Sequence, residues 1–262
     1  YGGADVVIQA ASATRLERVR AQFDLQRDAQ RRLELAASFV NGKLHNQLLV
    51  LRRYARHRAG EQATAHAATI RRIAEQAQRA RSLDALRGCE GLGARSYFAG
   101  VRALLGPEWG FEGRQARGSS DPFNSLCSFA YSLLCRAVLA EVHGAGLDAR
   151  IGALHETEPG RPALACDLME EFRPLVADSI ALNALLNGEI GVADFNSTER
   201  GWRLTTPACR RFVNAFEAKL DARVIVPDLE GEGTYREAIG AQCERFARTL
   251  LERAPYKPFK AR

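Results

Sequence analysis

LELAASFVNGKLHNQLLVL, which spans residues 33–51, carries apolar residues at intervals of three or four. Six of them form a regular series: Leu33, Ala37, Val40, Leu44, Leu48 and Leu51. Intervals of this size bring side chains onto one side of an α-helix. The stretch therefore predicts a long helix that packs one apolar stripe against a core.

Helical patterns continue along most of the chain. They predict helices over about 61–86, 91–105, 122–143, 167–180, 207–220 and 234–252. Asp121-Pro122 favours a helix start, because an acid caps a helix and proline is tolerated in its first turn. Pro174 predicts a local break in its helix. Short extended segments are predicted over 202–207 and 223–227, so the fold class is mostly α.

The first residues differ from the rest of the chain. Asp5-Val6-Val7-Ile8-Gln9-Ala10 predicts one short β-strand, which cannot be stable alone. The chain begins at Tyr1, and its single methionine is Met169. We therefore expect the sequence to be part of a larger polypeptide, whose preceding residues would complete the sheet.

The composition is typical of a folded domain with a polyanionic partner. Of the 262 residues, 46% are hydrophobic and 26% are charged, and the net charge is +6. Residues 15–58 contain eleven Lys and Arg against four acids. Such a stretch is either a solvated helix face or a surface that follows phosphate groups, and charge alone does not separate the two.

Cysteine spacing and hydropathy argue against other classes of protein. The six cysteines form no CxxC pair, which makes a zinc ribbon improbable and favours buried free thiols. No apolar run approaches the roughly 20 residues that span a bilayer, and no signal peptide is visible. We expect a cytoplasmic protein without a membrane partner.

Glu90 and His155 are candidates for chemistry. Glu90 lies between small residues in Gly88-Cys89-Glu90-Gly91, where a ligand can approach closely. His155 follows the apolar segment 151–154. Taken singly, a surface glutamate and a hydrogen-bonded structural histidine are the commoner interpretations.

Asp167 and Glu170 form a more specific pattern. Because they are three residues apart, both carboxylates are predicted on one helical face. Their repulsion would require a cation, or Arg173 one turn later, to offset it. Two carboxylates and one imidazole are suitable ligands for a divalent cation that also binds phosphate oxygens. Together with the arginine-rich stretch, they indicate phosphodiester chemistry on nucleic acid.

Four segments, in this order, resemble the CRISPR-associated spacer-acquisition integrase family. They are LRGCEGLGARSYF at 86–98, DPFNSL at 121–126, GALHE at 152–156 and LACDLMEEFRP at 164–174. NGKLHNQ at 41–47 is similar to the basic helix of that family, and YKPF at 256–259 matches the tail of some members. The resemblance covers nearly the whole chain.

The resemblance implies a small β-rich N-terminal domain, almost absent here, and a larger helical catalytic domain. Residues 1–12 would then be the last strand and linker of the first domain, and residues 13–262 the second. It also implies a site for Mg²⁺ or Mn²⁺ made by Glu90, His155 and Glu170, with Asp167 as a nearby acid. Some members carry aspartate where this chain has Glu170, a difference that a divalent cation tolerates.

The implied activity joins 3′-hydroxyl ends of captured DNA to the CRISPR repeat by transesterification in the prokaryotic cytoplasm. Implied partners are double-stranded DNA, a second copy of the chain, a small adaptor subunit and, in fused members, a reverse transcriptase. Candidate DNA contacts are Lys43, Arg52, Arg53, Arg56, Arg173, Asn124 and Tyr131. Two alternatives stay open: a metal-dependent nuclease on branched DNA or RNA without integration, and a non-catalytic helical nucleic-acid-binding scaffold.

Overall fold

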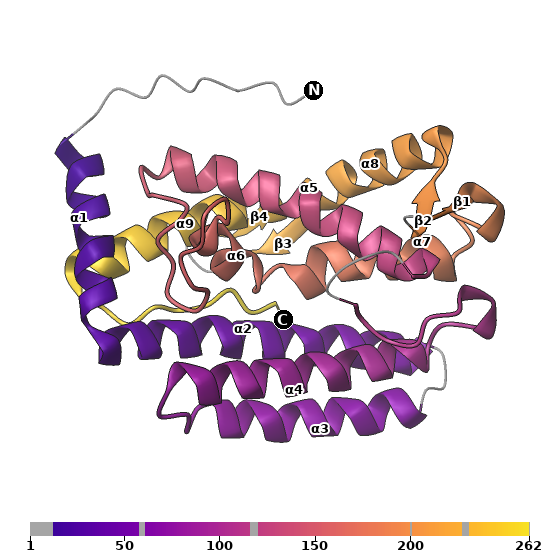
Figure 1. Ribbon diagram of the computed structural model, residues 1–262, viewed down its shortest axis with the longest axis horizontal. Helices are drawn as coiled ribbons and strands as arrows, with labels where there is room; N and C mark the ends of the chain where they lie inside the picture. Colours follow the sequence, from indigo (N-terminus) through magenta and orange to yellow (C-terminus); the bar gives the residue numbers. More distant parts are fainter. Residues whose placement is uncertain (1–12, 58–60, 116–119, 200, 227–230, 262) are drawn as a thin grey trace.

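Three long helices form one layer of the molecule. The computed structural model describes all residues except 1–12, 58–60, 116–119, 200, 227–230 and 262, so the strand predicted over 5–10 lies outside the described residues. The first helices are α1 (Ala13–Arg27), α2 (Ala29–His57), α3 (Glu61–Ala77) and α4 (Leu83–Arg102). Of these, α2, α3 and α4 lie side by side (Figure 1).

The remaining elements pack against the other side of α2 (Figure 1). The helices are α5 (Pro122–Gly144), α6 (Ala163–Met169), the π-helical η2 (Arg173–Asp178), α7 (Ser179–Leu186), α8 (Thr206–Leu220) and α9 (Tyr235–Glu252). Short 3₁₀ turns are η1 (Pro107–Trp109) and η3 (Val192–Asp194). Two antiparallel hairpins pair β1 (Phe195–Thr198) with β2 (Gly201–Leu204), and β3 (Arg223–Ile225) with β4 (Glu232–Thr234). The mostly α fold is confirmed, although β1 and β4 were not predicted.

The apolar stripe of α2 is wider than its sequence period indicates. Val40, Leu44 and Leu51 are buried as predicted. Leu33, Ala37 and Leu48 are only partly buried, and they pack against the core at its edge. Additional buried residues are Leu35, Ala36, Phe39 and Val50. The stripe widens because α2 contacts α3 and α4 on one side and η2 and α6 on the other.

Glycines allow α4 to approach α2 closely. A Cβ added at Gly93 would lie 2.2 Å from Cδ2 of Leu44, and one at Gly100 would lie 2.7 Å from Cδ2 of Leu51. Leucines of the α2 stripe therefore occupy the space that side chains at these two α4 positions would need. These contacts bring the middle and C-terminal part of α2 next to the second half of α4.

The boundary between α3 and α4 differs from the prediction. A break was expected after residue 86, but α3 ends at Ala77 and Ser82 caps α4, accepting a hydrogen bond from the backbone N–H of Ala85 at 3.2 Å. Glu90 therefore lies inside a helix. Gly88 and Gly91 do leave open space beside it, because a Cβ at either position would meet nothing within 4 Å.

Helix α5 corrects the expectation that no apolar run approaches the length needed to span a bilayer. Among the described residues, it is the one helix long and apolar enough, by length and composition, to cross a membrane. Its predicted start is confirmed, since Asp121 accepts a hydrogen bond from the backbone N–H of Asn124 at 2.8 Å. Nine α5 residues are buried in the protein core. A single helix of this kind is weak evidence for a membrane span, because core helices have the same length and composition.

The C-terminal tail, residues 253–261, returns along α2 without helical structure, as predicted. The Asn46 amide donates to the backbone oxygens of Glu171 and Phe259 at 2.8 and 2.9 Å. The buried Glu171 carboxylate accepts hydrogen bonds from the Tyr256 hydroxyl at 2.8 Å and from the Phe259 N–H at 2.6 Å. The tail therefore links α2 to the segment that carries Glu170.

Candidate functional site

The carboxylates of Glu90 and Glu170 meet at the ammonium of Lys43. Lys43 lies on α2 and is 5% exposed. Its Nζ is 2.7 Å from Oε2 of Glu170 and forms an ion pair with Oε1 of Glu90. Burial alone would lower the pKa of Lys43, but the two carboxylates raise it above its ordinary value. The Lys43 charge is therefore held inside the protein, and its contact with DNA stays a prediction.

Glu170 is a buried, ionised carboxylate. Its Oε1 pairs with NH1 of Arg173 at 2.8 Å. Burial would raise the pKa of Glu170, but the charges of Arg173, Lys43 and His155 outweigh it and lower that pKa to about 2. Oε2 is buried and lies 2.7 Å from the Lys43 ammonium, within hydrogen-bond distance. A carboxylate oxygen has a second lone pair, so Oε2 keeps capacity to bind a cation.

His155 lies between two acids. Its Nδ1 is 2.6 Å from Oδ1 of Asp167, and its Nε2 is 3.9 Å from Oε1 of Glu170. An ionised carboxylate only accepts hydrogen bonds, so Nδ1 carries the proton that is shared with Asp167. Nε2 is then the ring nitrogen that faces Glu170. This arrangement is the usual one for a metal-binding histidine, whose second nitrogen donates to a carboxylate.

Asp167 holds the loop that carries His155. Its carboxylate is fully buried and accepts hydrogen bonds from the backbone N–H groups of Leu154 and His155 at 3.0 and 2.9 Å. A Cβ at Gly152 would lie 2.5 Å from Oδ2 of Asp167, so the turn requires glycine there. Asp167 therefore orients His155.

Asp167 and Glu170 lie in one helical turn, as their spacing predicts. Helix α6 ends at Met169, but Glu170 keeps helical backbone angles and its N–H donates to the backbone oxygen of Asp167 at 3.2 Å. Both carboxylates face the imidazole of His155. Asp167 also binds the 153–155 loop, whereas Glu170 binds Lys43 of α2. The break predicted from Pro174 is confirmed, because the chain continues as a π-helix from Arg173.

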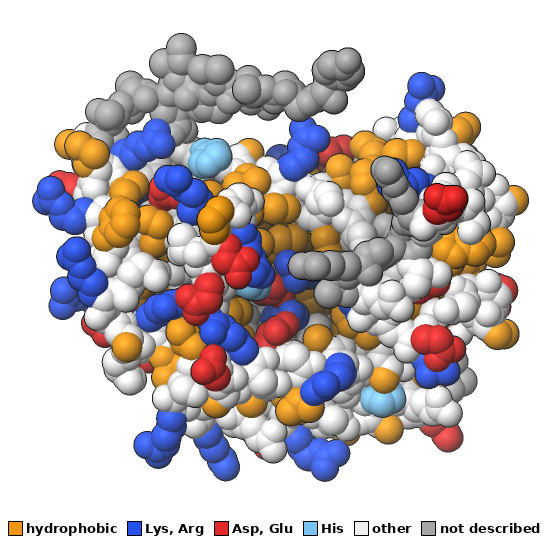
Figure 2. Space-filling view, viewed as in Figure 1, with side chains coloured by type: hydrophobic (Ala, Val, Ile, Leu, Met, Phe, Trp, Pro, Cys, Tyr) orange, Lys and Arg blue, Asp and Glu red, His pale blue; other side chains and the backbone are white. Residues whose placement is uncertain are grey.

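Several cations of the basic stretch hold the protein together. Arg32 donates from Nε to the backbone oxygen of Ala153 at 2.9 Å, and Arg87 of α4 donates to that of Leu154 at 2.7 Å. Both also pair with Glu156, which fastens the histidine loop from two helices. Arg18 pairs with Glu244 at 2.9 Å. Accordingly, Lys and Arg are interleaved with acids on the face seen in Figure 2.

Tyr131 connects the site to a second buried acid. Its hydroxyl donates to Oδ1 of Asp178 at 2.6 Å. The guanidinium carbons of Arg173 and Arg114 lie 4.9 and 5.0 Å from its ring centroid. Cation–π contacts therefore support the arginine that pairs with Glu170.

Asn124 lies inside the protein, whereas three candidate DNA-contacting arginines of α2 lie on its surface. Asn124 was predicted to orient a phosphate, but it is fully buried. Its amide donates to Gly113 and Asp121 and accepts from Arg114, so it joins residues 113–114 to the start of α5. Arg52, Arg53 and Arg56 are exposed.

Asp178 gives stability a testable pH dependence. Burial raises its pKa to about 6 despite the hydrogen bond from Tyr131. A raised carboxyl pKa contributes stability below the unfolded pKa near 4, and this contribution is lost as the pH rises through about 6. Asp178→Asn should therefore gain about 2 kcal/mol relative to the wild type between pH 4 and pH 7.

Urea unfolding at several pH values checks this expectation. Asp24→Asn on the exposed face of α1 serves as the control. A difference between Asp178→Asn and the wild type that stays constant from pH 4 to pH 7 would show that Asp178 ionises normally.

The described residues contain no group of three His, Cys, Asp or Glu side chains arranged to hold a metal ion. The reason is local: the Lys43 ammonium lies between Glu90 and Glu170, where a cation would bind both. The donor set nevertheless fits a divalent cation, because it offers the carboxylates of Glu90 and Glu170 and the Nε2 nitrogen of His155.

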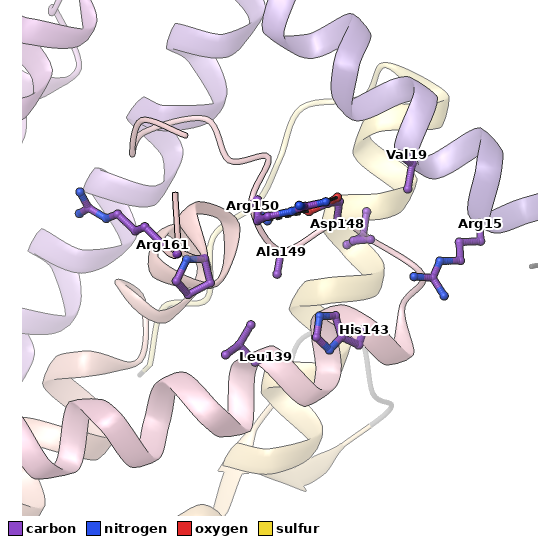
Figure 3. A pocket seen from close by; sticks show the side chains of 11 residues that line it. Arg15, Val19, Leu139, His143, Asp148, Ala149, Arg150 and Arg161 are labelled. Atoms are coloured by element: carbon purple, nitrogen blue, oxygen red, sulfur yellow. Dashed lines mark hydrogen bonds and ion pairs between the residues drawn. The ribbon is translucent and has the colours of Figure 1, made fainter. Parts of the chain in front are cut away.

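Another cavity of about 540 Å³ lies between α1, α5 and residues 147–162 (Figure 3). Arg15, His143 and Arg161 line it, and the Arg150 guanidinium is held by Asp148 at 2.7 Å. None of Glu90, His155 and Glu170 lines this cavity. The candidate site is thus separate from it.

Comparison with known proteins agrees with this geometry. The family model described as "CRISPR associated protein Cas1" matches residues 1–218. A CRISPR-associated endonuclease Cas1 of Thermus thermophilus is 39% identical over 246 residues, covering 92% of this chain and 71% of the relative.

Solved structures share the fold. A casposase bound to integration product has a TM-score of 0.84 at 28% identity, covering 94% of this chain and 72% of that chain. A Cas6-RT-Cas1–Cas2 complex contains a chain with a TM-score of 0.84 at 24% identity, a likeness of fold alone, which covers 99% of this chain and 28% of that one.

The fold and site therefore define a helical domain of the type found in CRISPR-associated endonucleases and casposases. The family match extends over most of the sequence, and the Thermus relative aligns over nearly all of it. The chain belongs to the Cas1 family of CRISPR-associated proteins.

Proposed function

We propose that this chain carries the catalytic centre of a divalent-metal-dependent DNA endonuclease and integrase of CRISPR adaptation. The observation that supports this most is the meeting of Glu90 and Glu170 at the buried Lys43 ammonium, with Nε2 of His155 3.9 Å from Oε1 of Glu170. A lysine ammonium in that position marks a place where the protein favours a cation. The family membership and the integration product named for the casposase agree with it.

Glu90, Glu170 and Nε2 of His155 would hold Mg²⁺ or Mn²⁺, and Asp167 would keep the imidazole in the required tautomer. When bound, the cation would offset charge on the scissile phosphate and lower the pKa of the attacking hydroxyl. Lys43 would leave its place between the carboxylates. Its ammonium, still close by, would then be available to a phosphate oxygen.

The proposed reaction needs no nucleophile from the protein. A DNA 3′-hydroxyl attacks phosphorus, one phosphodiester bond forms, another breaks, and the proton passes to the departing oxygen. With water as the nucleophile, the same centre is a nuclease. Burial raises the pKa of the Cys127 thiol well above its usual range, which agrees with a structural role for that residue.

The proposed partners follow the family. They are double-stranded DNA, a second copy of the chain and a small adaptor subunit, within the prokaryotic cytoplasm. The complex named Cas6-RT-Cas1–Cas2 supports an adaptor and an associated reverse transcriptase. Arg52, Arg53 and Arg56 are exposed and are proposed to contact DNA, whereas Arg173 is proposed to act near the phosphate because it is paired with Glu170.

An assay on labelled branched DNA tests the proposal. With Mn²⁺ or Mg²⁺, products longer than the labelled strand are expected, and EDTA should abolish them. Only shortened products would favour the nuclease that does not integrate. No product, together with no heat of metal binding in calorimetry, would leave the non-catalytic scaffold.

A further inference from the structure

A groove of about 570 Å³ opens beside the C-terminal half of α2, away from the candidate site. It is bounded by α2, η2 and α7, the end of α8 and the β3–β4 hairpin, and we refer to it as the Arg53–Lys219 groove. None of Lys43, Glu90, His155 and Glu170 lines it. Along α2, the ten residues from Lys43 to Arg53 span about 15 Å. The groove is therefore a second site on the same long helix.

Positive charge is concentrated in this groove. Arg53, Arg56, Lys219 and Arg223 line it, and the one acid among its lining residues is Glu232. The Arg223 guanidinium donates to the backbone oxygen of Glu232 at 3.3 Å, so that contact neutralises no charge.

The cations of the groove lack acidic partners. Within the described ranges, no ion pair joins Arg53, Arg56 or Lys219 to a carboxylate. Burial, and then the charge of Arg53, lower the pKa of Lys219. Crowded like charges are unfavourable unless an anion offsets them. This contrasts with Arg18, Arg32 and Arg87, whose charges are used inside the protein.

Flat and apolar surfaces lie among these cations. Tyr54 is partly exposed and lines the groove beside Arg53. Tyr235 is buried beneath the groove, with Nζ of Lys219 4.7 Å from its ring centroid. Ile225 at the rim is 47% exposed, which is unusual for a large apolar side chain. Cations beside aromatic and apolar surfaces are the combination that binds unpaired nucleic acid, whose phosphates and base faces are both accessible.

The size of the groove favours a single strand over a double helix. A volume of about 570 Å³ is within the range of small-ligand pockets. A double helix presents its phosphates on a broad outer surface and hides its base faces, so it cannot use the aromatic floor. One or a few unpaired nucleotides can use both features.

We propose that the Arg53–Lys219 groove binds the phosphates of an unpaired nucleic-acid strand, with its bases against Tyr54 and Ile225. The inference rests on the proposed function in one respect: the strand belongs to the nucleic acid that the candidate site processes. It changes the role given to Arg53 and Arg56 from gripping duplex to holding single strand.

Fluorescence anisotropy in EDTA tests this proposal without any catalysis. The probes are a labelled single-stranded 12-mer, the same sequence as duplex, and a labelled mononucleotide. Arg53→Glu with Lys219→Glu should weaken strand binding about 10-fold or more and change duplex binding little. Since each lost phosphate contact removes about 0.7 from the salt slope for single strands, that slope should fall by about 1.4.

Arg71→Glu with Arg72→Glu on the exposed face of α3 is the matched control, with the same change of charge. Arg53→Gln with Lys219→Met repeats the measurement if charge reversal prevents folding. Equal losses in the control pair, equal losses for duplex, or equally tight binding of the mononucleotide would overturn the proposal. So would full competition by an acidic peptide. If the wild-type protein binds the single strand but joins no DNA, that result would count against the proposed function and leave the groove proposal standing.

Discussion

Replacing Glu90 with glutamine is expected to reduce metal-dependent DNA cleavage and joining on the order of 10³-fold. The carboxylate contributes both ligation and charge, and a metal ion stabilises a phosphoryl transition state by several kcal/mol. Since each 1.36 kcal/mol changes the rate tenfold, loss of the ion gives a reduction of that size. Glu90 suits this test better than Glu170, because its side chain is 27% exposed and Lys43 keeps Glu170 as a partner.

The measurement is the single-turnover rate on branched DNA at saturating Mn²⁺, with metal binding followed by calorimetry. Glu75→Gln on the exposed face of α3 is the matched control and should retain the wild-type rate. DNA affinity in EDTA should stay unchanged in both variants. A Glu90→Gln enzyme within about threefold of the wild type would rule out a ligand role for Glu90.

Lys43→Met is expected to destabilise the metal-free protein by about 3–5 kcal/mol, the usual cost of leaving a buried charge without its partner. Without the ammonium, Glu170 loses the cation 2.7 Å from Oε2, and Glu90 loses its ion pair. Mn²⁺ should restore most of this stability, because a bound divalent cation replaces the missing charge. A concentration 100 times the dissociation constant adds about 2.7 kcal/mol.

Urea unfolding with EDTA and with Mn²⁺ measures both effects. Lys257→Met, an exposed lysine on the C-terminal tail, is the control and should respond to neither condition. Calorimetry should also show tighter Mn²⁺ binding in Lys43→Met than in the wild type, because no ammonium competes. Equal destabilisation with and without Mn²⁺ would mean that Lys43 and the metal do not share one place.

The candidate residues and their arrangement were predictable to different degrees. Glu90, His155 and Glu170 were named from motifs and from a family resemblance. Asp167 was expected as a nearby acid, and in the structure it orients the imidazole. The place of Lys43 between two carboxylates was not predicted. Neither contact leaves a local signal, since Lys43 and Glu90 are 47 residues apart.

The arginines illustrate the same limit. Charge alone did not separate a solvated helix face from a phosphate-binding surface. In the structure, Arg32 holds a loop 121 residues away, whereas Arg53 remains exposed and unpaired with any described acid. The outcome depends on which carbonyls and acids pack beside each guanidinium.

Helix periods, the Asp121-Pro122 helix start and the break at Pro174 are local properties, because they follow from backbone geometry within a few residues. The amino-acid order therefore gave the mostly α class and most helix positions. The charged centre arose only when Leu44 packed onto Gly93 and set Lys43 of α2 against Glu90 of α4. Whether a lysine there is solvated or buried between acids depends on every helix around it, because burial and charge pairing are properties of the assembled core.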